Sequence, residues 1–239
     1  MKFGIYGTSG YLGSLVLKNF ENSIPLNRDC FSNTNLVVDC SFPQNYLNQA
    51  VANKYIEQID SRSKYYQEKK IKYIYIGSYS SVTPINSVYG RIKQTAEKVV
   101  FVNGGTVLKC GLVTSIQNPQ GRFGQLFSLI QKLPFLILPS KETFGLHITR
   151  EEDFLDSLQS EVLYKSNGIF LLEATKTSDL NTLVSNLALK NRTFHLSYLF
   201  SSVFQKLVHL LPTRYFDNLK SIANWRHIEQ HEYIIIPKA

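Results

Sequence analysis

An apolar run leads directly into a glycine loop near the start of the chain, in the sequence Phe3-Gly4-Ile5-Tyr6-Gly7-Thr8-Ser9-Gly10-Tyr11-Leu12-Gly13. An amphipathic stretch follows from Leu15 to Phe20, so the loop is expected where a strand turns into a helix. Such a loop needs Gly7 for a tight turn, Gly10 for close approach of the backbone to a pyrophosphate, and Gly13 for packing of the helix against the strand. The pattern predicts a dinucleotide-binding loop, with an ordinary strand-to-helix turn as the alternative.

Outward from this loop, short apolar runs alternate with stretches of helical periodicity. This alternation is typical of a mostly parallel sheet that helices cover on both faces. We therefore expect an α/β fold with a compact, Rossmann-like doubly wound sheet. The expected strands are Phe3 to Tyr6, Ile24 to Leu26, Leu36 to Val38, Ile71 to Ile76 and Val107 to Val113, and the expected helices are Tyr11 to Phe20, Tyr46 to Tyr66 and Ser87 to Val100.

One connection is too short for a complete doubly wound sheet. Only about seven residues separate the second expected strand, which ends near Asn27-Arg28, from the third, which begins near Asn35, whereas a crossover between parallel strands needs a dozen or more. The sequence therefore predicts that one strand-helix unit is missing.

The pattern loosens beyond Gly111. A helix is expected over residues 125–132, and Thr149 with Glu152 has the spacing of a capping box at a helix start. A second cap, Thr177-Ser178-Asp179, predicts a helix to Leu189. Short strands are expected at 135–138, 144–148 and 168–173. Because no linker or repeat divides the chain, we expect one domain over residues 1–239, with a dinucleotide-binding core at 1–115 and, at 116–239, mainly a small C-terminal substrate lobe with returning Rossmann elements.

Composition and charge narrow the class of partner. The 239 residues are 44% hydrophobic, enough to bury a full core, and the net charge of +8 raises the question of nucleic-acid binding. The basic residues are scattered, however, and the densest run, Lys69-Lys70-Ile71-Lys72, lies at an expected helix end. A diffuse positive field suits a small phosphorylated ligand at least as well, so we expect no nucleic-acid partner.

The cysteines and the apolar segments indicate a compartment. Cys30, Cys40 and Cys110 are isolated thiols without the spacing of a disulfide framework or a metal site. We therefore expect a reducing, cytoplasmic location and no bound metal. Because Met1-Lys2 leads straight into the first expected strand, we expect no signal peptide, and no apolar segment reaches the roughly 18 residues of a membrane span.

A phenol and an ammonium lie four residues apart on one helical face in Tyr89-Gly90-Arg91-Ile92-Lys93. The serine cluster Gly77-Ser78-Tyr79-Ser80-Ser81 follows an expected strand, and ligands of parallel sheets bind at the carboxyl ends of the strands. A nearby ammonium lowers the pKa of a tyrosine from its ordinary value near ten, so that the phenol can exchange a proton with an alcohol oxygen. Since Tyr-x-x-x-Lys also occurs by chance in many helices, the strand-end serines are what favour a catalytic site.

The second expected strand bears on the choice of cofactor. About twenty residues after the glycine loop, an Asp or Glu would bind the ribose hydroxyls of NAD, but Asn27-Arg28 occupy this place. Because an arginine suits a 2′-phosphate, NADP is the predicted cofactor. The adjacent Asp29 could bind ribose hydroxyls, so NAD is the alternative.

Taken together, the glycine pattern, the strand-end serine and the Tyr-Gly-Arg-x-Lys motif resemble the short-chain dehydrogenase/reductase superfamily, in its extended branch of nucleotide-sugar epimerases, dehydratases and reductases. Asn86-Ser87-Val88-Tyr89-Gly90-Arg91-Ile92-Lys93, followed by Glu97, is similar to the dTDP-4-dehydrorhamnose reductase type. The resemblance also covers Leu108 to Val113 and extends to about residue 155.

This resemblance implies a role for each matching residue. Tyr89 would donate or accept the proton, Lys93 would tune its pKa and contact the ribose, and Ser78 would position the substrate oxygen, with Ser80 and Ser81 as alternatives to Ser78. The cofactor would lie against Gly7, Ser9, Gly10, Tyr11, Leu12 and Gly13 at the pyrophosphate, against Asn27 and Arg28 at the adenosine ribose, and against Cys40, Ser41, Phe42, Tyr89 and Lys93 elsewhere.

The expected function is an NADP-dependent oxidoreductase or epimerase that acts on the keto group of a nucleotide-linked sugar, as in polysaccharide biosynthesis. Its expected partner is the nucleotide sugar, and the sequence leaves both a monomer and a homodimer as alternatives. The alternative is a non-catalytic sensor of the same fold that binds NADP(H). An intact Tyr89–Lys93 pair favours the enzyme, because a sensor has no use for a tyrosine of lowered pKa.

Overall fold

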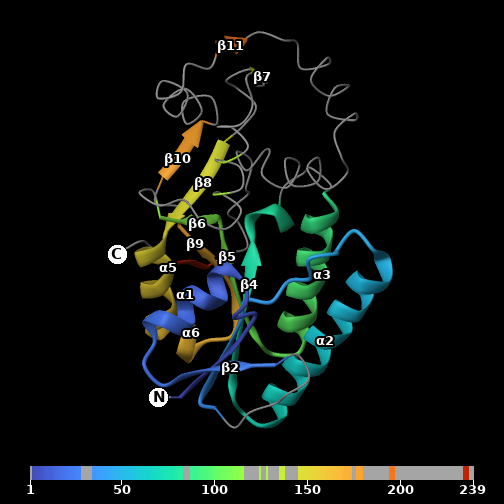
Figure 1. The fold of residues 1–239 in the computed structure, drawn as a ribbon. Helices are drawn as coiled ribbons and strands as arrows, with labels where there is room; N and C mark the ends of the chain where they lie inside the picture. The colour runs from blue at the N-terminus through green and yellow to red at the C-terminus, as the bar shows by residue number, and fades with distance from the viewer. Residues whose placement is uncertain are drawn as a thin grey trace.

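The fold is built on a seven-stranded sheet in the order β12-β9-β5-β4-β3-β1-β2, in which every neighbouring pair is parallel (Figure 1). It was obtained as a computed structural model that describes residues 2–27, 34–82, 87–115, 124, 128, 135–137, 145–173, 176–179, 194–196 and 234–236. The chain winds outward from β1 in both directions, which confirms the predicted Rossmann-like doubly wound sheet. Its strands are β1 (Phe3–Tyr6), β2 (Ser23–Leu26), β3 (Leu36–Asp39), β4 (Lys72–Ser78), β5 (Thr106–Cys110), β9 (Gly168–Leu172) and β12 (Ile234–Ile236).

Helices cover both faces of this sheet (Figure 1). One face carries α1 (Tyr11–Asn19), α5 (Glu151–Gln159) and α6 (Glu161–Lys165), and the other carries α2 (Gln49–Glu68) and α3 (Val88–Val102). Side-chain caps fix where the two long helices begin. Asn48 accepts hydrogen bonds from the amides of residues 50 and 51 at the start of α2, and Ser87 accepts one from the Gly90 amide at the start of α3.

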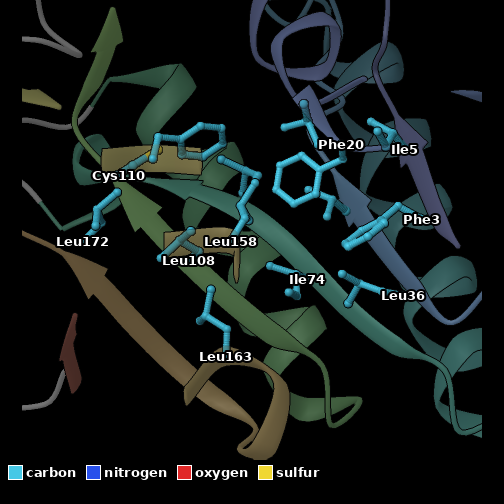
Figure 2. Close-up of a cluster of buried hydrophobic side chains, with 14 of the residues drawn as sticks. Phe3, Ile5, Phe20, Leu36, Ile74, Leu108, Cys110, Leu158, Leu163 and Leu172 are labelled. Atoms are coloured by element: carbon cyan, nitrogen blue, oxygen red, sulfur yellow. The ribbon is translucent and has the colours of Figure 1, made fainter. Parts of the chain in front are cut away.

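Successive residues of a strand contact opposite helix layers. On β4, Ile74 and Ile76 point to the α1 and α5 side, whereas Tyr73 and Tyr75 point to α2 and α3. The first side is an aliphatic core, part of which is shown in Figure 2, where Phe20 lies near Phe3 of β1. Burial on both faces explains why these strands read as continuous apolar runs in the sequence.

The second side is rich in tyrosine. Seven buried tyrosines pack between the sheet and the α2–α3 layer. Their hydroxyls bond to one another, since the Tyr6 and Tyr66 oxygens lie 3.0 Å apart and those of Tyr55 and Tyr75 lie 2.8 Å apart. These four hydroxyls are therefore buried with a hydrogen-bond partner, as buried polar groups usually are. The seven are Tyr6, Tyr46, Tyr55, Tyr66, Tyr73, Tyr75 and Tyr89.

A buried ion pair lies within this tyrosine layer. Asp39, at the carboxyl end of β3, accepts a hydrogen bond of 2.8 Å from the Arg62 guanidinium of α2 and another of 2.8 Å from the Tyr73 hydroxyl. The guanidinium lies 3.9 Å from the centre of the Tyr6 ring. Burial is the largest single influence on the pKa of Arg62 and lowers it, but Asp39, Tyr73 and Tyr6 together outweigh burial. The pKa is therefore raised and the arginine stays charged.

The short connection predicted after β2 is confirmed. β2 pairs with β1 and β3 pairs with the other side of β1, so residues 27–35 must join strands on opposite sides of β1. Among the described residues, no strand lies beyond β2. In the part of the chain that the structure describes, the strand-helix unit that would extend the sheet there is missing.

Two further sheets are described outside the main one. The larger has the order β10-β8-β6 and the smaller pairs β11 with β7. The expected strand from Val107 to Val113 is wrong as a single element, because it divides at Gly111 into β5 and β6. A β-carbon at Gly111 would lie 2.3 Å from the His147 carbonyl oxygen of β8, so the chain can turn into the second sheet only with glycine there. The elements are β6 (Leu112–Thr114), β8 (Gly145–Arg150), β10 (Lys176–Asp179), β7 (Phe135–Ile137) and β11 (Phe194–Leu196).

Both helix caps predicted in the second half are wrong. Thr149 is buried in β8, and α5 instead begins after Arg150, which forms a 2.8 Å ion pair with Asp153. Thr177 to Asp179 belong to β10, antiparallel to β8. Strand pairing therefore overrides the local capping signals. Most of the helices expected over 125–132 and 180–189 lies outside the described residues, and in the described part no helix is long and apolar enough to cross a membrane.

We expect Asp39→Asn to lower the free energy of unfolding by about 3–5 kcal/mol, because the Arg62 guanidinium would stay buried without an opposite charge. The double variant Asp39→Asn/Arg62→Met should lose less than Asp39→Asn alone, since it leaves no charge unpaired. Urea unfolding measures both. Lys64→Met, which removes the exposed 2.7 Å pair with Asp60, is the control and should cost no more than about 1 kcal/mol. Equal losses for the buried and the exposed pair would contradict the role of Asp39.

Candidate active site at the carboxyl edge of the sheet

The glycine loop has the geometry that its three glycines predict. Gly7 has a φ of +80°, and a β-carbon on it would lie 2.7 Å from the backbone of Ser41. A β-carbon on Gly13 would lie 2.3 Å from the Gly7 carbonyl oxygen, so this glycine lets α1 pack on the loop. Gly10 is exposed, and a β-carbon there would meet one atom within 4 Å, the same oxygen at 3.3 Å. The backbone is tightly packed at Gly7 and Gly13, on the inner side of the loop, and open at Gly10.

Helix α1 begins at this opening. Its N-cap is Gly10, and no side chain caps it. Ser9 is exposed at the same point, and Leu12 packs against the aliphatic core. The Tyr11 hydroxyl donates a hydrogen bond to Glu151, and burial together with this bond raises the pKa of Tyr11. The first turn of α1 therefore presents backbone amides and a positive dipole end, which suit an anion.

The loop after β3, residues 40–42, lies beside the glycine loop and is held by the ion pair of the tyrosine layer. The Ser41 amide donates to Asp39 over 2.8 Å, and the Ser41 hydroxyl accepts from Arg62 over 3.1 Å. The Ser41 carbonyl accepts from the Tyr55 hydroxyl over 2.9 Å. Each polar group of Ser41 is thus bonded to a side chain of the tyrosine layer, which fixes the wall against which Gly7 turns.

Phe42 connects this loop to the catalytic pair predicted from the sequence. Its ring lies 4.7 Å from the ring of Tyr89, and the Lys93 ammonium lies 5.2 Å from its centre. Tyr89 and Lys93 are both buried on the face of α3 that packs on the sheet. The structure thus brings Phe42, Tyr89 and Lys93 together, although Phe42 is more than forty residues from the other two.

Strand β4 holds the lysine in place. The Lys93 ammonium donates a 2.8 Å hydrogen bond to the carbonyl of Ile76 and lies 4.5 Å from the centre of the Tyr75 ring. Its positive charge also acts on Cys40, where it opposes the larger effect of burial, which raises the pKa of that thiol. Burial raises the pKa of the Cys110 thiol to about 12. Both thiols therefore stay protonated at neutral pH and are poor nucleophiles.

The serines follow at the carboxyl end of β4. Ser78 is the last residue of the strand, and its hydroxyl oxygen accepts a 3.2 Å hydrogen bond from the amide of Ser80. Ser80 and Ser81 form a short 3-10 turn, η1 (Tyr79–Ser81). The Ser81 hydroxyl donates to the carbonyl of Ser78 over 2.6 Å and accepts from Lys109 over 3.2 Å. Among the described contacts, the Ser81 proton is therefore engaged, while that of Ser78 is available to a ligand.

Some predicted residues can be placed only in part. Asn27 is exposed just beyond β2, while Arg28 lies outside the described residues. The described residues contain no group of three or more His, Cys, Asp or Glu side chains placed to bind a metal ion.

Sequence reasoning missed the two buried ion pairs behind the site, Asp39 with Arg62 and Glu97 with Lys109. A signal for the first was present, because Arg62 falls on the apolar face of α2 with Tyr55, Ile59 and Tyr66, where a solvated charge is not expected. An aspartate directly after the apolar residues of β3 was its natural partner.

Comparison by sequence finds no matching family model and no matching curated protein. Comparison by structure does find matches. The dTDP-4-dehydrorhamnose reductase from Yersinia enterocolitica superposes with a TM-score of 0.65 at 15% identity over 85% of each chain. The same type of enzyme from Bacillus anthracis, solved with NADP, gives 0.64 at 11% identity over 85% of this chain and 86% of the other. The UDP-N-acetylglucosamine 4-epimerase from Bacillus cereus gives 0.60 at 15% identity over 92% and 98%. In its fold, the chain is thus similar to these two reductases and to this epimerase.

Proposed function

We propose that the chain is an NADP-dependent oxidoreductase or epimerase that acts on the keto group of a nucleotide-linked sugar. The observation that carries this proposal is the arrangement at the carboxyl edge of the sheet. There, a glycine loop open at Gly10 lies across residues 40–42 from Tyr89 and Lys93, and Ser78 ends the strand that holds Lys93.

The glycine loop fits a dinucleotide. The open side at Gly10 and the amides of the first turn of α1 suit a pyrophosphate, whereas the inner side is filled by the close contacts at Gly7 and Gly13. One of the structural neighbours was solved with NADP, which supports the same class of ligand here. A bound nicotinamide would supply or accept the hydride. Residues 40–42, Tyr89 and Lys93 would line its position.

Tyr89 is the proton donor or acceptor in this proposal. Its phenolic oxygen would carry the proton that moves to or from the sugar oxygen as the hydride moves. Lys93 lies one helical turn after Tyr89 on α3 and is held by the Ile76 carbonyl, so it would place a positive charge on this side of the site. The same ammonium has further hydrogens for a ribose hydroxyl.

Ser78 is the hydroxyl that would orient the sugar oxygen. Of the candidates Ser78 and Ser81, the second already uses its proton on a backbone carbonyl. Ser78 accepts from the Ser80 amide, which leaves its own hydrogen for the substrate. This difference supports Ser78.

The substrate class follows from the neighbours and from charge. The reductases and the epimerase that share the fold act on dTDP- and UDP-linked sugars, as their names state. A net charge of +8 suits an anionic nucleotide diphosphate.

We expect Tyr89→Phe to lower kcat by about a hundredfold or more, because the ring still packs on Phe42 while the proton carrier is lost. The affinity for NADPH should barely change. Lys93→Met should impair both turnover and NADPH binding, and Ser78→Ala should fall between the two in its effect on turnover. The assay follows NADPH oxidation with dTDP-4-dehydrorhamnose, and UDP-N-acetylglucosamine with added NAD tests epimerisation.

Tyr164→Phe, on α6, removes a hydroxyl that bonds a helix carbonyl away from the site and should leave kcat unchanged. Full activity of Tyr89→Phe would rule out the proposed mechanism. Tight NADPH binding without turnover of either sugar would favour the sensor instead.

The glycine loop gives a second expectation. Gly10→Val should abolish NADPH binding and leave the protein folded, because its side chain would occupy the open side of the loop, where the backbone conformation is extended. Gly13→Val, in contrast, should unfold the loop by collision with the Gly7 carbonyl. NADPH fluorescence titration and thermal unfolding distinguish the two. Normal NADPH affinity in a folded Gly10→Val protein would mean that the loop is only a turn.

The cofactor preference rests on the sequence after β2. We expect NADPH to bind more tightly than NADH, since Arg28 would pair with the 2′-phosphate, and Arg28→Ala should remove most of the difference. Parallel titrations with both nucleotides measure it. NADH binding as tight as NADPH in the unmodified protein would assign NAD and exclude this role for Arg28.

A further inference from the structure

Three side chains and the backbone of Ser78 form a closed ring behind the site, joined by three hydrogen bonds and one ion pair. The Ser78 amide donates to the Glu97 carboxylate over 3.0 Å, and that carboxylate forms an ion pair of 3.0 Å with the Lys109 ammonium. Lys109 donates to the Ser81 hydroxyl over 3.2 Å, and Ser81 donates to the carbonyl of Ser78 over 2.6 Å. The ring thus begins at the backbone N–H of Ser78 and returns to its C=O.

The ion pair in this ring is almost fully enclosed, with 4% of the Lys109 side chain and 2% of the Glu97 side chain exposed. A buried pair is weak support for stability, because desolvation of two charges offsets most of their attraction and an apolar pair would do as well. Its geometry offers another explanation, because Glu97 bonds the Ser78 amide and Lys109, through Ser81, reaches the carbonyl of the same residue.

The strand is shaped to admit the carboxylate. A β-carbon on Gly77 would lie 2.7 Å from the nearer carboxylate oxygen of Glu97. Any larger residue at position 77 would therefore push Glu97 away from the Ser78 amide. Glycine at the next-to-last position of this otherwise bulky strand makes room for the ring.

Helix α3 links the ring to the proposed acid or base. Tyr89, Lys93 and Glu97 follow one another at intervals of four residues and are all buried on the same face of α3. Tyr89 and Lys93 lie at the proposed site of chemistry, while Glu97 bonds the amide of Ser78, whose hydroxyl would orient the substrate. One rigid helix thereby sets both the position of Tyr89 and the position of Ser78.

We propose that Glu97, Lys109 and Ser81 are positioning residues that hold the Ser78 hydroxyl at a fixed place relative to Tyr89. This rests on the proposed function, in which Ser78 orients the substrate oxygen. None of the three needs to touch the substrate. Their effect is on kcat, because a small displacement of an orienting group is costly once the substrate is bound.

The test uses Ser81→Ala, which opens the ring without removing a charge. We expect kcat to fall by about ten- to a hundredfold, with the NADPH dissociation constant unchanged. Ser157→Ala is the matched control, because Ser157 is equally buried and donates a 2.6 Å bond to the carbonyl three residues earlier, as Ser81 does, but on α5. It should lower the melting temperature by a similar amount and leave kcat unchanged. If Ser81→Ala keeps kcat within about twofold of the unmodified enzyme, the proposal is overturned.

A double-mutant cycle separates positioning from general destabilisation. If the ring acts through the Ser78 hydroxyl, Ser81→Ala should have little further effect on kcat in a Ser78→Ala background. The same fold-loss in both backgrounds would show that the ring supports the fold only, and would overturn its positioning role.

A readout without turnover keeps the ring testable if the proposed function fails. Hydrogen–deuterium exchange of the peptide covering β4 and η1 should accelerate in Ser81→Ala and stay unchanged in Ser157→Ala. An unmodified protein that binds no NADPH and turns over neither sugar would refute the proposed function. Unchanged exchange in Ser81→Ala would refute the ring, whatever the activity.

Discussion

The buried charge of Asp39 is the constraint on which the rest of the site depends. It ends β3 at the point where residues 40–42 leave the sheet, and it binds both Arg62 and the Ser41 amide. Ser41 in turn forms the wall behind Gly7, and Phe42 contacts Tyr89 and Lys93. A hydrophobic residue at position 39 could fill the same space, but it could not fix the loop that joins the proposed nucleotide site to the proposed catalytic pair.

The tyrosine layer between the sheet and helices α2 and α3 also helps to fix the position of residues 40–42. An aliphatic core packs in several ways at similar cost, whereas buried hydroxyls must find partners in particular directions. Tyr73 bonds Asp39, and Tyr55 bonds both Tyr75 and the Ser41 carbonyl. The half of the core that lies behind the proposed cofactor is therefore the polar and directional half. The opposite half, under α1 and α5, is aliphatic and carries no comparable network among its described residues.

The sequence predicted those features that depend on neighbours along the chain. The glycine loop, the main strands, the missing unit after β2 and the spacing of Tyr89 and Lys93 can be read from periodicity and local turn chemistry. The ion pair of Asp39 with Arg62 could not be assigned in this way, since the partners are 23 residues apart and meet only when α2 packs on β3. The failed caps at Thr149 and Thr177 have the opposite cause, because both have good local capping patterns that pairing with other strands overrides.

The shortened sheet and the proposed chemistry are compatible because they lie at different places. Among the described strands, the unit is missing beyond β2, whereas Ser78, Tyr89 and Lys93 belong to β4 and α3, on the other side of β1. Pro25, opposite Ile5 in the register of β2 with β1, has no N–H to offer a further strand. A proline suits an edge strand, and β2 is the outermost strand on this side among the described residues. The shortened edge would face the adenosine end of a bound dinucleotide, whereas β4, which carries Ser78, keeps a neighbouring strand on each side.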